Sequence, residues 1–233
     1  MKYTNSPLVS YVKLSPNHSG LRKHDIDTIT IHCVVGQCTV ETLGQIFLPV
    51  KRQASCNYGI GYDGRIGLYV DEKNRSWCSS SAANDNRAIT IEVASDKTHP
   101  YAITPEAYKS LVSLCADICK RNNIKKLVWS TDKNIRVNHL NGCNMTVHRD
   151  YANKACPGEY LYNRMGQIAS EVNKLLEEYD KVSEIRDNSK VSSYAAESWK
   201  KLKDKGATDG SNPKSPCTRE QLAVILDRLG LLG

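Results

Sequence analysis

The chain contains no long hydrophobic run, and this absence excludes whole classes of protein. Its 233 residues hold no stretch apolar enough to cross a membrane. Residues 1–7 also lack the apolar segment of a secretory signal. We therefore expect a protein that is made and folded in the cytosol and that does not insert into a membrane.

Cysteine pairs and blocks of like charge are missing as well. The nine cysteines form an odd set without a CxxC pair, so we expect reduced thiols rather than disulfides. The net charge of +7 would suit nucleic acid, an anionic membrane or an acidic polymer such as a bacterial cell wall. Because no run of like charges is long enough to form a nucleic-acid-binding tail, we expect no nucleic-acid partner.

Two segments far apart in the sequence show the alternation of apolar and polar side chains that is typical of β-strands. Residues 29–35 and 88–94 alternate with a period of two. His32 and Glu92 fall on the non-core faces of these strands, so the two side chains meet on one surface if the strands are neighbours. Between the strands, the Asp63-Gly64 pair predicts the tight turn of a β-hairpin.

Helical patterns alternate with these strands. Thr104 is a suitable N-cap for a helix that begins at Pro105, and an apolar stripe predicts a long amphipathic helix that ends near Tyr179. Residues 124–130 fit a further short strand. Strands that alternate with helices indicate an α/β domain over residues 1–180.

The last part of the chain has a different character. Residues 181–193 are polar and poorly periodic, which is typical of a linker, and residues 194–233 contain two short helical patterns that predict a small helical hairpin. About 40 residues is near the lower limit for an independent hydrophobic core. We therefore expect the hairpin to dock on the main domain, bind a partner or self-associate as a homo-oligomer.

The strongest chemical signal is the segment 146–158. It places His148 and Cys156 eight positions apart, with Lys154 just before the cysteine. His32, on the first predicted strand, is a third candidate ligand. Two imidazoles and one thiolate suit zinc, and three protein ligands leave one coordination position for a reactive water. The sequence therefore predicts the open zinc site of a hydrolase rather than a structural zinc site.

Other interpretations of these residues stay open. Cys156 and His148 could instead form the nucleophilic pair of a cysteine hydrolase. Tyr58 could simply pack within the hairpin. Asp150 could brace its loop, or it could orient a ligand imidazole.

Four short segments together resemble a known family. Residues 29–32, 57–58, 89–92 and 148–158 are similar to the zinc-dependent N-acetylmuramoyl-L-alanine amidases, a group that includes phage lysozymes of the amidase type and the peptidoglycan recognition proteins. The resemblance covers most of residues 20–178. It implies a mixed central β-sheet flanked by helices. It also implies cleavage of the amide that joins N-acetylmuramic acid to the L-alanine of the peptidoglycan stem.

The resemblance also implies roles for single residues. His32, His148 and Cys156 would hold the zinc, and Glu92 would act as the general base. Lys154, and with it Tyr58, would stabilise the oxyanion of the tetrahedral intermediate. A peptidoglycan-binding module without hydrolytic activity would share the fold, but recognition-only relatives lack the ligand at Cys156.

The C-terminal segment has a resemblance of its own. Residues 199–228 are similar to a fragment of the surface-layer-homology type of wall-binding repeat, which is also found in clostridial phage lysins. This implies a positively charged wall anchor. The whole chain then fits a clostridial phage endolysin that stays in the cytosol until a holin-type partner releases it to lyse the bacterial wall. An autolytic or sporulation amidase of the host is the nearest alternative.

Overall fold

The computed structural model describes residues 3–186 and 190–232, with the backbone alone for residues 181–186. The chain divides into two compact units, Met1–Leu176 and Glu177–Gly233. Within the described part of the chain, no helix combines the length and the apolar character needed to cross a membrane.

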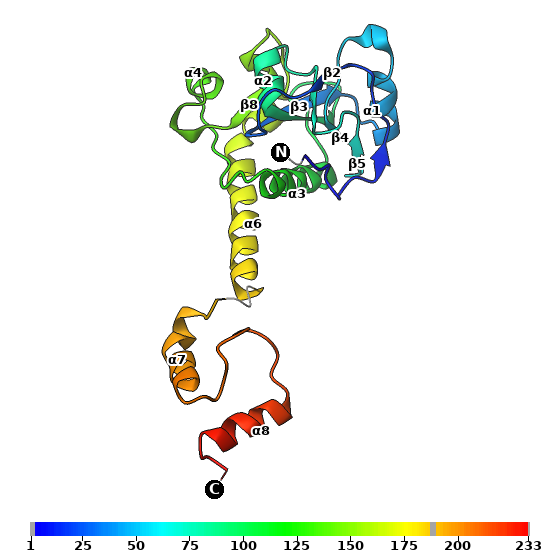
Figure 1. Cartoon of the computed structure of the whole chain (residues 1–233). Coiled ribbons are helices and arrows are strands. Elements are labelled where there is room, and N and C mark those ends of the chain that lie inside the picture. Colours follow the sequence, from blue (N-terminus) through cyan, green and yellow to red (C-terminus); the bar gives the residue numbers. More distant parts are fainter. Residues whose placement is uncertain (1–2, 187–189, 233) are drawn as a thin grey trace. The chain divides into compact units, whose positions relative to one another are not determined.

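The first unit is built on a six-stranded mixed sheet (Figure 1). Its strands, in spatial order, are β1 Tyr11–Val12, β5 Ile66–Leu68, β4 Tyr58–Ile60, β7 Ala88–Ser95, β3 Thr28–Val35 and β8 Met145–Val147. Only β4 and β5 pair antiparallel, and the other neighbours pair parallel. A separate antiparallel pair joins β2 His18–Leu21 to β6 Asn74–Ser76. The predicted α/β fold with a mixed central sheet is confirmed.

Helices cover the two faces of this sheet unequally. Helix α3, Pro105–Arg121, and the first part of α6, Met165–Arg186, pack their apolar side chains against the buried isoleucines of β3 and β7. On the opposite face, helix α1, Val40–Phe47, packs on Tyr69 beside β4 and β5. Because α1 packs over β1, β5 and β4, it does not cover the part of this face that is formed by β7, β3 and β8.

Two glycines allow α1 and Tyr69 to lie so close to the sheet. A Cβ atom at Gly59 or at Gly67 would run into the Tyr69 ring, and the Tyr69 hydroxyl donates to the carbonyl oxygen of Val40 at 2.7 Å. Gly59 stands opposite Glu92 in the β4–β7 register. The face that α1 covers is therefore the same face that carries Glu92.

The remaining helices are short. Helices α2, α4 and α5 span Ala82–Arg87, Lys133–Val137 and Gly158–Tyr162, and 3₁₀ turns span Val50–Arg52, Leu140–Gly142, His148–Asp150 and Ser193–Ala195. The second unit contains α7, Ala196–Asp204, and α8, Arg219–Arg228. Thr218 caps α8 with a hydrogen bond from the backbone N–H of Gln221 at 3.1 Å. No residue of α8 is buried.

Two local predictions are wrong. The strand expected at residues 124–130 does not form, because side chains satisfy its backbone hydrogen-bonding groups. The backbone N–H of Leu127 donates to the side-chain oxygen of Asn173, and its carbonyl accepts from the side-chain nitrogen of the same residue. The backbone N–H of Val128 donates to the side chain of Asn144. The long helix does not end near Tyr179 but continues to Arg186. No glycine or proline follows Gly166 in that helix to stop it. The first six residues of the expected linker are thus helical, and residues 187–189 lie outside the described part.

Candidate metal centre

The register of the sheet brings three distant segments to one point. In the parallel pairing of β3 with β7, His32 stands opposite Glu92. In the pairing of β3 with β8, Ile31 stands opposite Val147, the last residue of β8. His148 comes directly after this strand and therefore lies beside His32. The His32 and His148 rings lie edge to face with their centroids 5.0 Å apart.

Cys156 reaches the same point from the loop that leads into α5. Its Sγ lies 3.5 Å from Nδ1 of His32 and accepts the backbone N–H of Cys33 at 3.4 Å. One donor atom from each of His32, His148 and Cys156 lies within 4.8 Å of the other two. The structure therefore brings the three predicted ligands together at a spacing that a single ion can bridge.

The protonation states of these groups suit a cation. Burial, and then the neighbouring His148, lowers the pKa of His32 well below its ordinary value, and Nε2 of His32 is buried without a hydrogen-bond partner in the described residues. Burial and the charge of Lys154 lower the pKa of His148. Both imidazoles are therefore neutral near pH 7, which is the form that binds metal. Burial raises the pKa of the Cys156 thiol, so its proton leaves only when a cation replaces it.

Glu92 borders this cluster in an apolar setting. Burial, followed by the neighbouring Cys33 thiol, raises the pKa of Glu92 to about 8. The thiol of Cys78 donates to its Oε1 at 3.8 Å, and its Oε2 is buried without a partner among the described residues. His32, Cys78 and Glu92 form a second group whose donor atoms lie within 4.8 Å of one another.

A pocket of about 540 Å³ opens above these groups, and His148, Cys156, Glu92 and Lys154 all line it. Trp77 lies on its wall. Asn84 is buried away from it and is hydrogen-bonded to Thr30 and Thr146. Lys154 is exposed at the rim. The pocket gives a substrate access to the cluster.

Ser80, which the sequence did not single out, and Asp150, which it did, hold His148 and its loop in place. The hydroxyl of Ser80 is hydrogen-bonded to Nε2 of His148 at 3.1 Å, and Ser80 adopts the left-handed conformation with φ of 67°. Asp150 does not touch the imidazole. Its carboxylate instead accepts the backbone N–H of Val147 at 3.1 Å and pairs with the buried Arg136 at 2.5 Å, so it braces the loop.

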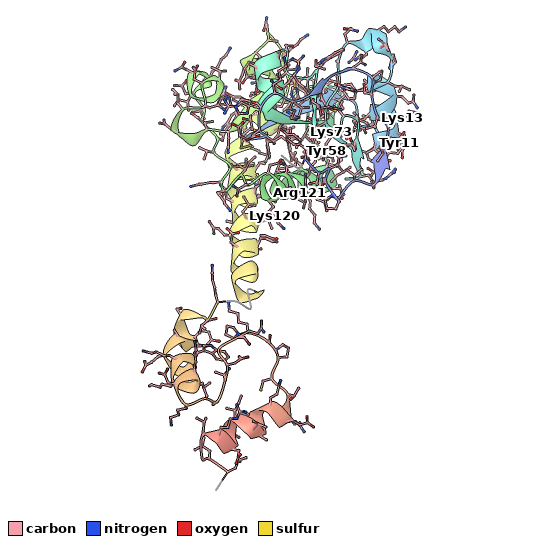
Figure 2. The ribbon with its side chains drawn as sticks, in the orientation of Figure 1. Tyr11, Lys13, Tyr58, Lys73, Lys120 and Arg121 are labelled. Atoms are coloured by element: carbon pink, nitrogen blue, oxygen red, sulfur yellow. The ribbon has the colours of Figure 1, made fainter. Side chains whose placement is uncertain are left out.

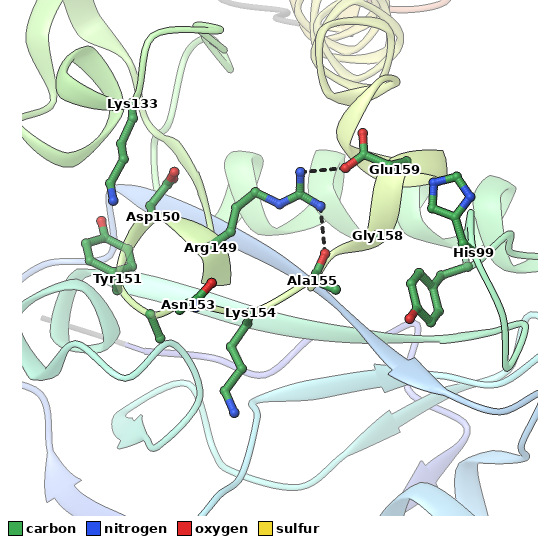
Figure 3. Close-up of a pocket in the computed structure, with 12 residues that line it drawn as sticks. His99, Lys133, Arg149, Asp150, Tyr151, Asn153, Lys154, Ala155, Gly158 and Glu159 are labelled. Carbon is green, nitrogen blue, oxygen red and sulfur yellow. Dashed lines mark hydrogen bonds and ion pairs between the residues drawn. The ribbon is translucent and has the colours of Figure 1, made fainter.

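Arg149 closes the loop between the two candidate ligands (Figure 3). Its backbone N–H donates to the carbonyl oxygen of Cys156 at 3.2 Å, and its guanidinium donates to Ala155 at 2.6 Å and to Glu159 at 2.7 Å. The same guanidinium stacks on Tyr162, 4.4 Å from the ring centroid. A second pocket, of about 730 Å³, lies along this part of the loop, and Lys154 lines both pockets.

Tyr58 is not part of this arrangement, which corrects the oxyanion role predicted for it. In the β4–β7 register it stands opposite Ile91, one position away from Glu92, so its side chain enters the core on the other face of the sheet. There its hydroxyl donates to Glu72 at 2.6 Å and accepts the backbone N–H of Ser6 at 2.8 Å. Glu72 in turn pairs with Arg121 at 2.6 Å. Tyr58 and Arg121 are labelled among the side chains of the first unit in Figure 2.

Comparisons with known proteins identify relatives of this chain and of its fold. The family model described as N-acetylmuramoyl-L-alanine amidase matches residues 22–159, while no curated protein sequence matches. The solved structure of an AmpD derivative is 18% identical, with 72% of this chain and 99% of that chain covered and a TM-score of 0.52. The catalytic domain of XlyA is 15% identical, with 70% and 97% covered and a TM-score of 0.50. PlyL is 14% identical, with 74% and 97% covered and a TM-score of 0.50. These three structures share the fold of the first unit.

Proposed function

The chain belongs to the N-acetylmuramoyl-L-alanine amidase family, and from this membership we propose that it is a zinc-dependent peptidoglycan hydrolase whose metal is held by His32, His148 and Cys156. The scissile bond is the amide between N-acetylmuramic acid and the L-alanine of the stem peptide. The main support for the proposal is that two neutral imidazoles and one thiol lie close together beside an open pocket.

The donor set fits zinc and an open site. Nitrogen and sulfur donors are those that zinc prefers, and three protein ligands leave a position of its tetrahedral shell free. When bound, zinc lowers the pKa of a water molecule and polarises the scissile carbonyl. Ser80 fixes the His148 ring, and Asp150 fixes the backbone directly before it, so the protein presents its donors already oriented.

Glu92 acts as the general base in this proposal. The carboxylate form of Glu92 takes a proton from the attacking water and returns it to the leaving amine. Its unpartnered Oε2 is the atom free to do so. The pKa of Glu92, about 8 in the metal-free protein, lies near neutrality, and a cation held by the three ligands would favour this ionised form. The ammonium group of Lys154, at the rim of the same pocket, stabilises the oxyanion that forms on the scissile carbonyl.

We further propose a biological role as a phage endolysin. In this role the protein stays in the cytosol until a holin-type partner opens the membrane, and then it lyses the wall. The positive net charge and the resemblance of residues 199–228 to a wall-binding repeat support an anchor in the second unit. Self-association of that unit is the rival role, and light scattering of the full chain against a chain that ends at Asp180 distinguishes the two.

Metal dependence tests the enzymatic proposal. A chelator is expected to abolish wall hydrolysis and added zinc to restore it, while Cys156→Ala is expected to lose bound zinc. A cysteine hydrolase built on Cys156 and His148 predicts the reverse, namely activity that survives chelation and a covalent adduct on the thiol. The raised pKa of Cys156 favours the zinc enzyme, because a nucleophilic cysteine needs a lowered pKa.

A further inference from the structure

We propose that Arg52 and Arg75, together with Lys154, form a carboxylate-binding subsite beside the metal centre, and that this subsite selects stem peptides with a free carboxylate on the second residue from the scissile amide. The proposal rests on the proposed amidase function and adds the substrate feature that the enzyme recognises.

The subsite is a pocket of about 430 Å³ that adjoins the metal centre. His148, Trp77, Cys78 and Lys154 line both this pocket and the one above Glu92, so the two hollows share a wall. The three cations come from separate segments: Arg52 ends a 3₁₀ turn, Arg75 lies in β6, and Lys154 lies in the loop that carries the ligands. The fold therefore gathers positive charge here from parts of the chain that are distant in sequence.

Apart from the electrostatic attraction between Arg52 and Glu92, which together line the neighbouring pocket, the positive charge of this pocket is not paired by its own walls. Among the described residues, no hydrogen bond or ion pair engages the side chain of Arg52 or of Lys154, and the Arg75 guanidinium donates only to the hydroxyl of Ser19. The single carboxylate on the wall is Asp85. It is already engaged by the backbone N–H groups of Cys78 and Ser79. An anionic ligand would supply the missing partner.

The Trp77 indole lines the pocket and is held in place by a hydrogen bond. Its Nε1–H donates to the Ser19 hydroxyl at 2.6 Å, and the same hydroxyl accepts from Arg75. One serine therefore holds the aromatic plane and one guanidinium in fixed positions. An ordered guanidinium binds a carboxylate through two parallel hydrogen bonds with little further loss of side-chain freedom.

The distance along the stem peptide indicates which of its carboxylates can reach the pocket. An extended chain advances about 3.3–3.6 Å per residue, so a group on the second stem residue lies within about 7 Å of the scissile amide. With that amide at the metal centre, the second residue is within reach of the adjoining pocket. In peptidoglycan this residue is a glutamate linked through its side chain, and its α-carboxyl is either free or amidated. The three cations distinguish these two forms because they differ by one negative charge.

The test compares two synthetic muramyl tripeptides, identical except for a free or an amidated α-carboxyl on the second residue. The zinc-loaded full-length protein is expected to cleave the free form with a kcat/KM about tenfold higher, the size of one charge-assisted hydrogen bond. In the double variant Arg52→Gln/Arg75→Gln the ratio of the two kcat/KM values should fall to about one. Lys51→Gln removes an exposed neighbouring charge that does not line the pocket, so it is expected to leave the ratio unchanged.

The outcomes separate the subsite from the enzyme. Equal cleavage of both peptides by the unaltered protein would overturn the subsite while leaving the amidase function intact. A ratio that stays near tenfold in a double variant with an unchanged melting temperature would also overturn it. If neither peptide is cleaved while wall fragments show no amidase products, the proposed function fails and the subsite fails with it.

Discussion

His32 of β3 and Glu92 of β7 stand opposite each other in the parallel register of the central sheet. Sixty residues separate them in the chain, yet sheet geometry places both on the same face of the sheet, beside the part of that face that α1 covers. One supplies an imidazole proposed to bind the metal, and the other supplies a carboxyl with a raised pKa. The proposed hydrolase chemistry follows from this pair more than from any single motif.

Glu92 makes the stability of the metal-free protein depend on pH. The folded protein holds the Glu92 proton up to about pH 8, whereas an unfolded chain releases it near the ordinary value of 4.5. The free energy of unfolding is therefore expected to fall as the pH rises from about 4.5 to about 8 and to level off above. Glu92→Gln should remove this contribution. Urea denaturation of both metal-free proteins across this range measures it, and identical slopes would contradict the expectation.

Arg136→Ala is expected to destabilise the first unit by about 3–5 kcal/mol, because it leaves the Asp150 carboxylate buried without its partner. The two side chains are 2% and 0% exposed, so water cannot replace the lost interaction. The matched control is Arg65→Ala, which breaks an ion pair that is more than 40% exposed on both sides and is expected to have little effect. Equal effects of the two substitutions in chemical denaturation would refute the bracing role of Arg136.

Lys154→Met is expected to lower kcat by roughly 10²–10³-fold, the usual cost of removing one oxyanion donor. Lys154 is exposed and is not one of the three donors, so bound zinc and the melting temperature should stay the same. Lys154→Arg, which keeps the charge, should recover part of the rate. An unchanged kcat, or a loss of zinc in Lys154→Met, would assign the residue a different role.

Tyr58→Phe separates a structural tyrosine from a catalytic one. The substitution removes the hydroxyl that lies between Glu72 and the backbone of Ser6. We expect a loss of about 1–3 kcal/mol in the free energy of unfolding, because buried polar groups lose a partner. The kcat should not change at a temperature where the variant is folded. A large fall in kcat with full stability would restore the catalytic role that the structure argues against.

The sequence predicted those parts of the site that depend on local patterns. Period-two alternation assigned His32 and Glu92 to the polar faces of their strands, and the α/β pattern made neighbouring strands the natural arrangement. The capping residue Thr104 was also correctly identified, because an N-cap is a short-range feature of the chain.

The parts that were missed depend on tertiary contacts. Tyr58 and Glu92 lie on adjacent strands, but a register shifted by one position sends their side chains to opposite faces. Ser80, Cys78 and Arg136 reach the site or its loop from segments whose placement no local pattern reveals. Strand β8 is only three residues long, too short for alternation to mark it, although it sets the position of His148.

The most direct test of the proposed amidase activity is digestion of purified bacterial walls by the zinc-loaded protein, followed by mass spectrometry of the fragments. A zinc-dependent amidase gives stem peptides with a free N-terminal L-alanine and intact glycan strands, and we expect no such products after zinc is removed by a chelator. New reducing ends on the glycan, or cleavage that continues without the metal, would contradict it.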